Sequence, residues 1–163
     1  MNRVWFYEFP PGMLGIAEAD GFVTGVFFAE NGKIPAGLSA PGYEKKESPL
    51  IKKTAFRLER YFAGKLKLFD LPLKPAGTDF QKSVWNALLE IPYGETRTYS
   101  EIAAQAGNPK ACRAAGMANN KNPIVIIIPC HRVIGKDDSL TGYGGGLKIK
   151  QYLLDLEKNS RIL

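Results

Sequence analysis

Cysteine and histidine are scarce in this chain of 163 residues, which contains two cysteines and one histidine. So few ligands cannot build a four-ligand zinc site made mainly of Cys and His. Two cysteines also cannot supply the several disulfides that hold small secreted domains together. We therefore expect two free thiols, Cys112 and Cys130, and neither a metal nor a cofactor.

Long apolar segments are missing as well. The longest, Pro123 to Cys130, is far shorter than the roughly 20 residues of a membrane-spanning helix. No charged-then-apolar leader opens the chain. We expect a monomer of the cytoplasm, or of the nucleus in a eukaryote, with no membrane partner.

Positive charge is what the sequence has in excess. The net charge is +6, and the segment from Arg97 to Lys136 contains six Lys and Arg residues against Glu101 alone. Most of the excess therefore lies in one quarter of the chain. Such a distribution predicts a local positive face and favours a polyanionic partner.

Residues 1–74 predict a small α+β domain with an antiparallel sheet and a helix. Asp20-Gly21 separates two of its strands, and this dipeptide is typical of a tight hairpin turn. Ser48 and Pro49 begin the helix as N-cap and first-turn residue. The expected strands are residues 3–9, 13–19 and 22–28.

Residues 78–163 predict a second, mostly helical domain, which follows a linker rich in Pro and Gly. Thr78 begins its first helix with a capping-box spacing. A second helix is capped by Thr98 or Ser100, and a third runs from about Lys110 to Ala118. The second and third helices form a helix-turn-helix outline.

The third helix has two interpretations, because small residues surround Arg113 in it. Either the helix packs closely in the core and Arg113 extends to water, or the helix approaches another surface closely and Arg113 projects into it. The small residues of interest are Ala111, Ala114 and Gly116.

The only histidine, His131, directly follows Cys130. The apolar, β-branched run from Ile124 to Ile128 predicts a buried strand that delivers both residues to the edge of the core. A thiol becomes a good nucleophile when a neighbouring base or cation helps to ionise it. An inert buried thiol is the alternative, but the flanking Pro129 and Arg132 favour a nucleophile.

Pro129-Cys-His-Arg-Val133 resembles the active-site signature of the O6-alkylguanine-DNA alkyltransferases, also called methylated-DNA–protein-cysteine methyltransferases. Further segments resemble family motifs in the same order, and the resemblance covers residues 78–163 strongly. They are Pro92–Glu95, Thr98–Ala103, Gly107–Lys110, Arg113–Gly116, Asn122-Pro123 and Gly142–Leu147.

The resemblance implies repair of double-stranded DNA by direct, single-turnover transfer of an alkyl group from O6-alkylguanine, or O4-alkylthymine, to Cys130. It implies that His131 is the general base, that Glu157 orients it, and that Tyr99 protonates the leaving base. Such a reaction requires the nucleotide to be flipped out of the duplex.

The resemblance also assigns residues to substrate and DNA. Arg113 would enter the base stack from the minor groove, with Ala111, Ala114 and Gly116 letting the helix approach. Asn122 would tie the active-site turn by side-chain-to-backbone hydrogen bonds, and the carbonyls of Cys130 and Val133 would accept from the guanine amine. Tyr143 and Gly144 would belong to a lid over the base.

Three other functions are alternatives to alkyl transfer. A non-enzymatic lesion-binding relative would lack Cys130. A Cys-His hydrolase would need an oxyanion site, which the sequence does not show. A plain helix-turn-helix regulator would not need the Pro129–Arg132 segment. Cys112 departs from the family pattern, either as a small apolar residue or as a second, oxidisable thiol.

Overall fold

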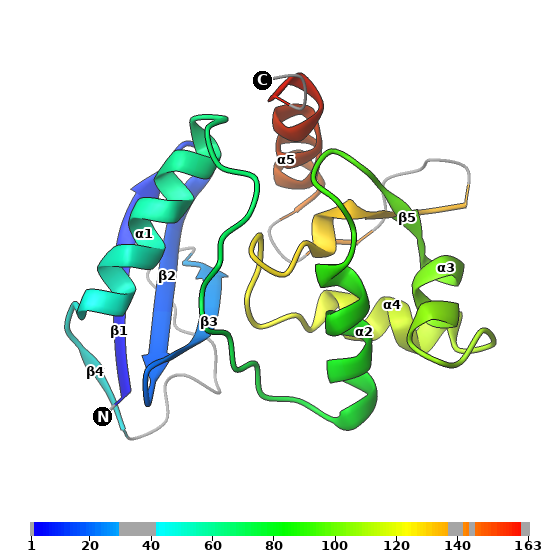
Figure 1. Ribbon diagram of the computed structural model, residues 1–163, viewed down its shortest axis with the longest axis horizontal. Coiled ribbons are helices and arrows are strands. Elements are labelled where there is room, and N and C mark those ends of the chain that lie inside the picture. The colour runs from blue at the N-terminus through cyan, green and yellow to red at the C-terminus, as the bar shows by residue number, and fades with distance from the viewer. Residues whose placement is uncertain (1, 30–41, 137–141, 144–145, 161–163) are drawn as a thin grey trace. The chain divides into compact units, whose positions relative to one another are not determined.

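The computed structural model describes residues 2–29, 42–136, 142–143 and 146–160. They divide into two compact units, Met1–Pro75 and Ala76–Leu163. The predicted fold class, α+β, is confirmed by the elements of the two units (Figure 1).

The N-terminal unit is a four-stranded sheet with one helix. Strands β1 (Asn2–Phe9), β2 (Gly12–Ala19) and β3 (Phe22–Phe28) pair antiparallel as expected. A short strand β4 (Tyr43–Lys45) adds to β1 in parallel, so the sheet is mixed rather than purely antiparallel. The strand order is β3-β2-β1-β4.

Local sequence explains the turns and helix of this unit. Asp20 and Gly21 join β2 to β3, both with positive φ (53° and 83°), as a primed hairpin turn requires. Ser48 accepts a hydrogen bond from the Ile51 amide and begins α1 (Pro49–Phe62). The apolar face of α1, which includes the fully buried Leu58, lies along the sheet (Figure 1).

The segment expected to be a plain linker is tied to the sheet over part of its length. The amide of Val23 donates to the Pro72 carbonyl (2.8 Å), and the amide of Lys74 donates to the Val23 carbonyl (2.9 Å). The linker prolines therefore lie at the edge of the sheet, where a missing N–H does not interrupt a ladder.

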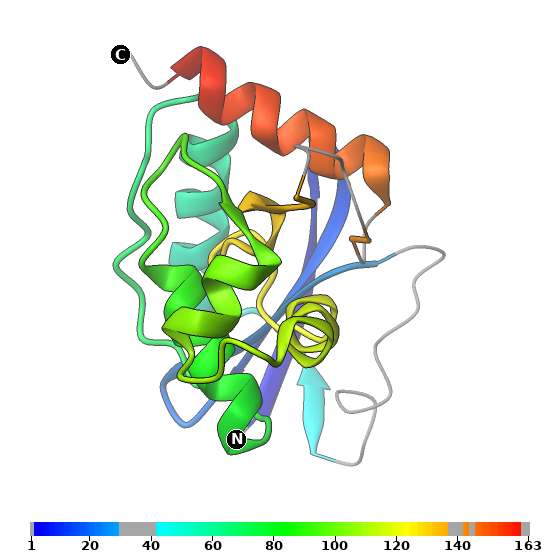
Figure 2. The same ribbon diagram turned by 90° about the vertical axis from the view of Figure 1, so that its right-hand side faces the viewer.

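The C-terminal unit consists of helices around a two-stranded parallel pair. Helices α2 (Asp79–Leu89) and α3 (Tyr99–Gln105) begin with complete capping boxes at Thr78 and Thr98, so Thr98 rather than Ser100 caps α3. Helix α4 (Cys112–Asn120) packs on both (Figure 2). The remaining elements are β5 (Arg97–Thr98), the 3-10 turn η3 (Cys130–Arg132), β6 (Val133–Ile134) and α5 (Leu147–Ser160).

The helix-turn-helix outline is confirmed by α3 and α4. Helix α4 begins at Cys112, two residues later than expected, and its N-cap residue, Ala111, makes no side-chain cap hydrogen bond. No helix of the described residues is long and apolar enough to cross a bilayer.

Candidate active site

Cys130 follows a tight turn and not the buried strand that the sequence predicted. Ile126 has a φ of 72°, and the amide of Ile127 donates to the Val125 carbonyl at 2.8 Å. Four of the five residues of this run are buried, but its backbone reverses, and Val125 and Ile128 form an isolated bridge. The strand prediction was wrong because apolar, β-branched composition indicates burial without fixing the backbone path.

Two asparagines hold this turn. Asn122 accepts from the Ile124 amide (2.9 Å) and donates to the Ile128 carbonyl (2.7 Å), so one side chain closes both ends of the turn. Asn119, at the end of α4, donates to the Cys130 carbonyl at 3.3 Å. The Val133 amide donates to the same carbonyl. The carbonyl of Cys130 therefore already accepts two hydrogen bonds.

A buried network surrounds His131. Its Nε2 lies 2.6 Å from Oε2 of Glu157, and both side chains are almost fully buried. Arg132 donates to both oxygens of the same carboxylate, from Nε at 2.8 Å and from Nη2 at 3.1 Å. The Gly94 amide donates to Oε1 of Glu157 at 3.1 Å. Glu157 thus holds the histidine and is itself held by an arginine in bidentate geometry.

The protonation states of this network follow from its neighbours. Burial would raise the pKa of the Glu157 carboxyl, but hydrogen bonds and charge from His131 and Arg132 outweigh it and hold that pKa well below its usual range. Burial lowers the pKa of His131, against the opposing effect of Glu157. An ionised carboxylate can only accept, so a neutral His131 carries its proton on Nε2 and presents Nδ1 as the basic nitrogen.

The acceptor thiol is buried, with 3% of Cys130 exposed. Burial raises the pKa of this thiol to about 11, although the side chain of Asn122 and the charge of Lys150 lower it in part. Burial also raises the pKa of Tyr143 well above its ordinary value, and the charges of Cys130 and Glu157 add to this effect. The resting sulfur is thus a thiol at neutral pH and needs a base.

The sequence interpretation missed two cations of this site. Arg132 was counted toward the positive face, but it is buried against Glu157 and its Nη1 donates to the Ile91 carbonyl at 2.7 Å. Lys150 is fully buried in α5. A signal existed for Lys150, because it lies on the same helical stripe as Leu153 and Glu157, at spacings of three and seven residues.

The residues assigned to DNA contact all lie in α4 or at its N-cap. Arg113 and Ala114 are exposed on α4, while Ala111 and Gly116 are partly exposed. A Cβ added at Gly116 would lie 3.6 Å from the Tyr99 ring, an ordinary contact. Packing against Tyr99 therefore does not require glycine at this position, and close packing in the core does not account for it.

The remaining assigned residues are placed only in part. Tyr99 is the first residue of α3, and Val133 begins β6, where it is fully buried. The Gly146 amide donates a hydrogen bond to the Tyr143 carbonyl at 2.9 Å. Gly144 lies outside the described residues.

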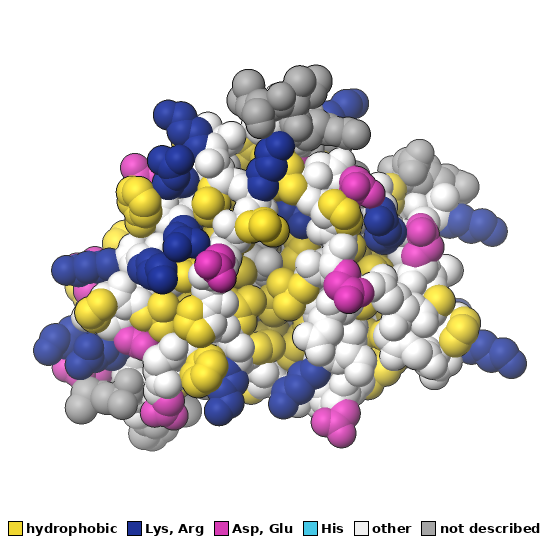
Figure 3. All heavy atoms as spheres, viewed as in Figure 1, with side chains coloured by type: hydrophobic (Ala, Val, Ile, Leu, Met, Phe, Trp, Pro, Cys, Tyr) yellow, Lys and Arg dark blue, Asp and Glu magenta, His cyan; other side chains and the backbone are white. Residues whose placement is uncertain are grey.

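In the described residues, no three Cys, His, Asp or Glu side chains gather where they could hold a metal ion. On the face shown in Figure 3 no histidine colour is visible, in keeping with the burial of His131.

Comparison with known proteins bears on the whole chain. Residues 79–159 match the family described as 6-O-methylguanine DNA methyltransferase, DNA binding domain. The methylated-DNA–protein-cysteine methyltransferase of Methanosarcina acetivorans is 52% identical over 93% of this chain and 95% of its own. The constitutive enzyme of that name from Bacillus subtilis is 45% identical over 98% of each chain.

Solved structures agree with these relatives. The O6-methylguanine methyltransferase of Mycobacterium tuberculosis has a TM-score of 0.87 and 45% identity, over 98% of this chain and 94% of its own. A structure of the same organism's protein in complex with DNA has a TM-score of 0.87 and 43% identity, over 97% and 94% of the two chains. The motifs, the fold and these relatives together show that the chain belongs to the methylated-DNA–protein-cysteine methyltransferase family.

Proposed function

We propose that this protein repairs double-stranded DNA by moving the alkyl group of O6-alkylguanine, and of O4-alkylthymine, onto Cys130 once and irreversibly. The observation that carries the proposal is the buried thiol of Cys130 beside a His131–Glu157–Arg132 network. Its relatives are named for methyl transfer from methylated DNA to a protein cysteine. The protein acts as a monomer in the compartment that holds the chromosome, the cytoplasm or a eukaryotic nucleus.

The bond changes are those of a displacement at carbon. The sulfur of Cys130 forms a bond to the alkyl carbon while the bond from that carbon to the base oxygen breaks. The thiol proton passes through a water molecule to Nδ1 of His131. A base is needed here because the pKa of Cys130 is raised to about 11, and His131 can serve because burial keeps it neutral. Glu157 orients the ring and stabilises its charged form.

The leaving base must be stabilised as its negative charge develops. Tyr99 donates its phenolic proton toward a ring nitrogen of the flipped base, a task suited to a group whose ordinary pKa is about 10. Asn122 keeps the turn that holds Cys130 in place. The carbonyl of Val133 accepts from the guanine amine, and we give it this role because the Cys130 carbonyl already accepts from Asn119 and Val133. Tyr143 and Gly144 cover the base.

Helix α4 supplies the DNA contact. Arg113 enters the stack from the minor groove and replaces the flipped nucleotide, and Ala111, Ala114 and Gly116 keep the helix surface low enough to approach. Minor-groove contact suits repair because its pattern of donors and acceptors is nearly independent of sequence. The DNA affinity should fall as salt rises, since Lys110, Arg113 and Lys121 would displace counterions.

The test is incubation with duplex DNA that carries a radiolabelled O6-methylguanine. We expect one label per protein chain, located on Cys130 by peptide mapping, and no further transfer after the first. The Cys130→Ser variant should bind the duplex and accept no label. Cys112→Ser is the matched control, because it removes the other thiol and should leave transfer unchanged. Label on Cys112, retained transfer by Cys130→Ser, or repeated turnover would each contradict the proposal.

A further inference from the structure

Met117 is a large apolar side chain with 67% of its surface exposed. In the described part of the C-terminal unit it is the most exposed of the large hydrophobic residues; the others are Leu89 at 45%, Leu147 at 49% and Tyr152 at 36%. Single exposed apolar residues are common on proteins, so exposure alone does not indicate a function. The position of Met117 on α4, however, indicates one.

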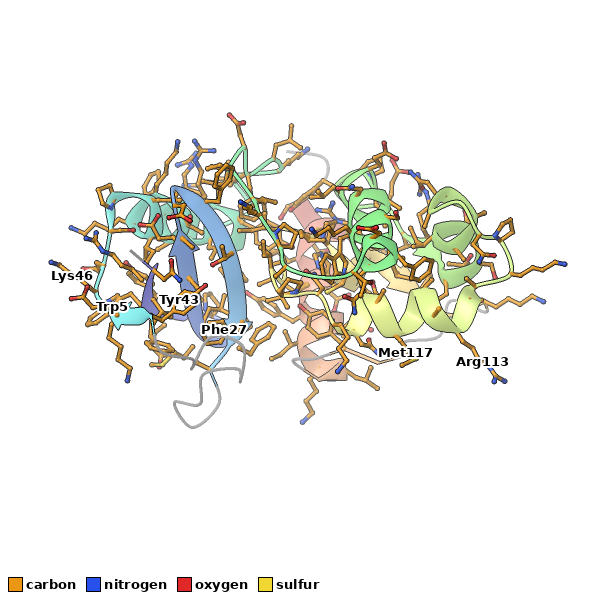
Figure 4. The ribbon with its side chains drawn as sticks, turned by 90° about the horizontal axis from the view of Figure 1, so that it is seen from below. Trp5, Phe27, Tyr43, Lys46, Arg113 and Met117 are labelled. Atoms are coloured by element: carbon orange, nitrogen blue, oxygen red, sulfur yellow. The ribbon has the colours of Figure 1, made fainter. Side chains whose placement is uncertain are left out.

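Met117 lies one helical turn after Arg113 on the outer face of α4. The side chains of both residues leave the same side of the helix (Figure 4). Asn120 and Lys121 continue this exposed face, whereas the other side of α4 is buried through Ala115, Ala118 and Asn119. Helix α4 contains no acidic residue. The exposed face is thus cationic at its two ends and apolar at its middle.

This face is fixed relative to Cys130. Asn119, on the buried side of α4, donates to the carbonyl of Cys130 at 3.3 Å. The indole of Trp85 donates to the carbonyl of Ala118 at 2.9 Å. Residues exposed on α4 therefore have a fixed position relative to the Cys130 sulfur, because the hydrogen bond from Asn119 ties the helix to Cys130.

We propose that Met117 is a second wedge, which enters the minor groove beside Arg113 and packs on the base step next to the flipped nucleotide. This inference rests on the proposed function. Side chains that open a base step from the minor groove are commonly apolar, whereas Arg113 is charged. A flexible thioether makes favourable contacts with aromatic rings, and nucleobases offer such rings at every sequence.

The spacing fits neighbouring base steps. Residues four apart on a helix have Cβ atoms about 5–6 Å apart, which lies between one and two base steps of about 3.4 Å. Arg113 and Met117 can therefore act on adjacent steps. In this arrangement Arg113 fills the position of the lost base, and Met117 holds its neighbour unstacked.

The test compares Met117→Ala with the wild type on duplex DNA and on the free base O6-methylguanine. We expect the transfer rate on duplex DNA to fall about ten-fold, the change that ~1.4 kcal/mol of lost contact produces, and the rate on the free base to stay unchanged. The fluorescence rise of 2-aminopurine placed next to the lesion should shrink with the same variant. The salt dependence of DNA binding should be unaffected, because Met117 carries no charge.

Two further variants make this test specific. Met117→Leu restores an apolar side chain of similar volume and should recover most of the duplex rate. Leu89→Ala removes another exposed apolar residue of the same unit, from α2, and should change nothing. Equal duplex rates for Met117→Ala and wild type would overturn the wedge while leaving alkyl transfer intact. A parallel loss on the free base would also overturn it, and a wild-type protein that accepts no label would instead overturn the proposed function.

Discussion

The two units of this protein differ in what they bury. Among the described residues, the buried polar side chains of the N-terminal unit are Glu18, Ser48 and Thr54, and α1 and the sheet pack through apolar contacts. The C-terminal unit buries seven polar side chains: Asn119, Asn122, His131, Arg132, Lys150, Glu157 and Ser160. Four of these seven are ionisable. Burying charge costs stability unless each group is paired, so the contrast indicates which unit is built for chemistry.

The presence of a surface hollow does not identify the unit that is built for chemistry. The N-terminal unit has a hollow of about 510 Å³ between the β1–β2 turn and α1, lined by aromatic rings such as Tyr7 and Phe56. Glu8, Glu47 and Glu59 also line it, but no cysteine or histidine does. A nucleophile with a positioned base distinguishes the C-terminal unit, and this hollow contains neither.

The strongest test of this contrast removes one partner of the buried ion pair. Arg132→Met leaves the Glu157 carboxylate buried with less compensation, and such a loss typically costs ~3–5 kcal/mol. Urea unfolding should show a fall of this size. Arg97→Met is the control, because Arg97 pairs with Glu95 at 3.2 Å on the surface, where an ion pair is worth ~1 kcal/mol or less. Similar losses in the two variants would contradict the assigned difference.

A second test uses pH. The pKa of Cys130 is raised from an unfolded value of about 9 to about 11. The folded state therefore holds this proton more tightly, so its contribution is complete below pH 9 and disappears as pH rises to 11. Two pKa units correspond to ~3 kcal/mol. The difference in unfolding free energy between wild type and Cys130→Ala should change by about this amount between pH 8 and pH 11 and stay flat below pH 8. A flat difference throughout would mean that the thiol is not buried as described.

Local signals predicted much of the fold. The turn at Asp20-Gly21, the N-caps at Ser48 and Thr78, and the helix-turn-helix follow from rules that act over a few residues, and the structure confirms them. These features depend on backbone groups that one neighbouring side chain can satisfy. Pairing of β4 with β1 is a long-range contact, and no local pattern announced it.

The sequence named candidate residues for the site but did not predict the backbone path that leads to Cys130. A family motif contains Cys130 and His131, and the resemblance implied Glu157 as the partner of His131. Nε2 of His131 lies 2.6 Å from Oε2 of Glu157. The path before Cys130 was wrong because Ile126 adopts a positive φ, which is rare for a β-branched residue. Asn122 closes this turn through two hydrogen bonds. Their geometry depends on how the Asn122 side chain bends back to its own backbone segment, and hydrophobic periodicity carries no information about this.

The smallest expected effect comes from a test that replaces one helix cap in each unit. Ser48 caps α1 and Thr98 caps α3, and replacing either with alanine should cost ~1 kcal/mol of unfolding free energy. Their effects on alkyl transfer should differ. Thr98 fixes the start of α3, where Tyr99 is the first residue, so Thr98→Ala should slow transfer to duplex DNA by more than its loss of stability explains. Ser48→Ala should leave transfer unchanged at a temperature where both variants are folded. Equal transfer rates would show that the position of Tyr99 does not depend on the cap, and that this part of the C-terminal unit is held by packing alone.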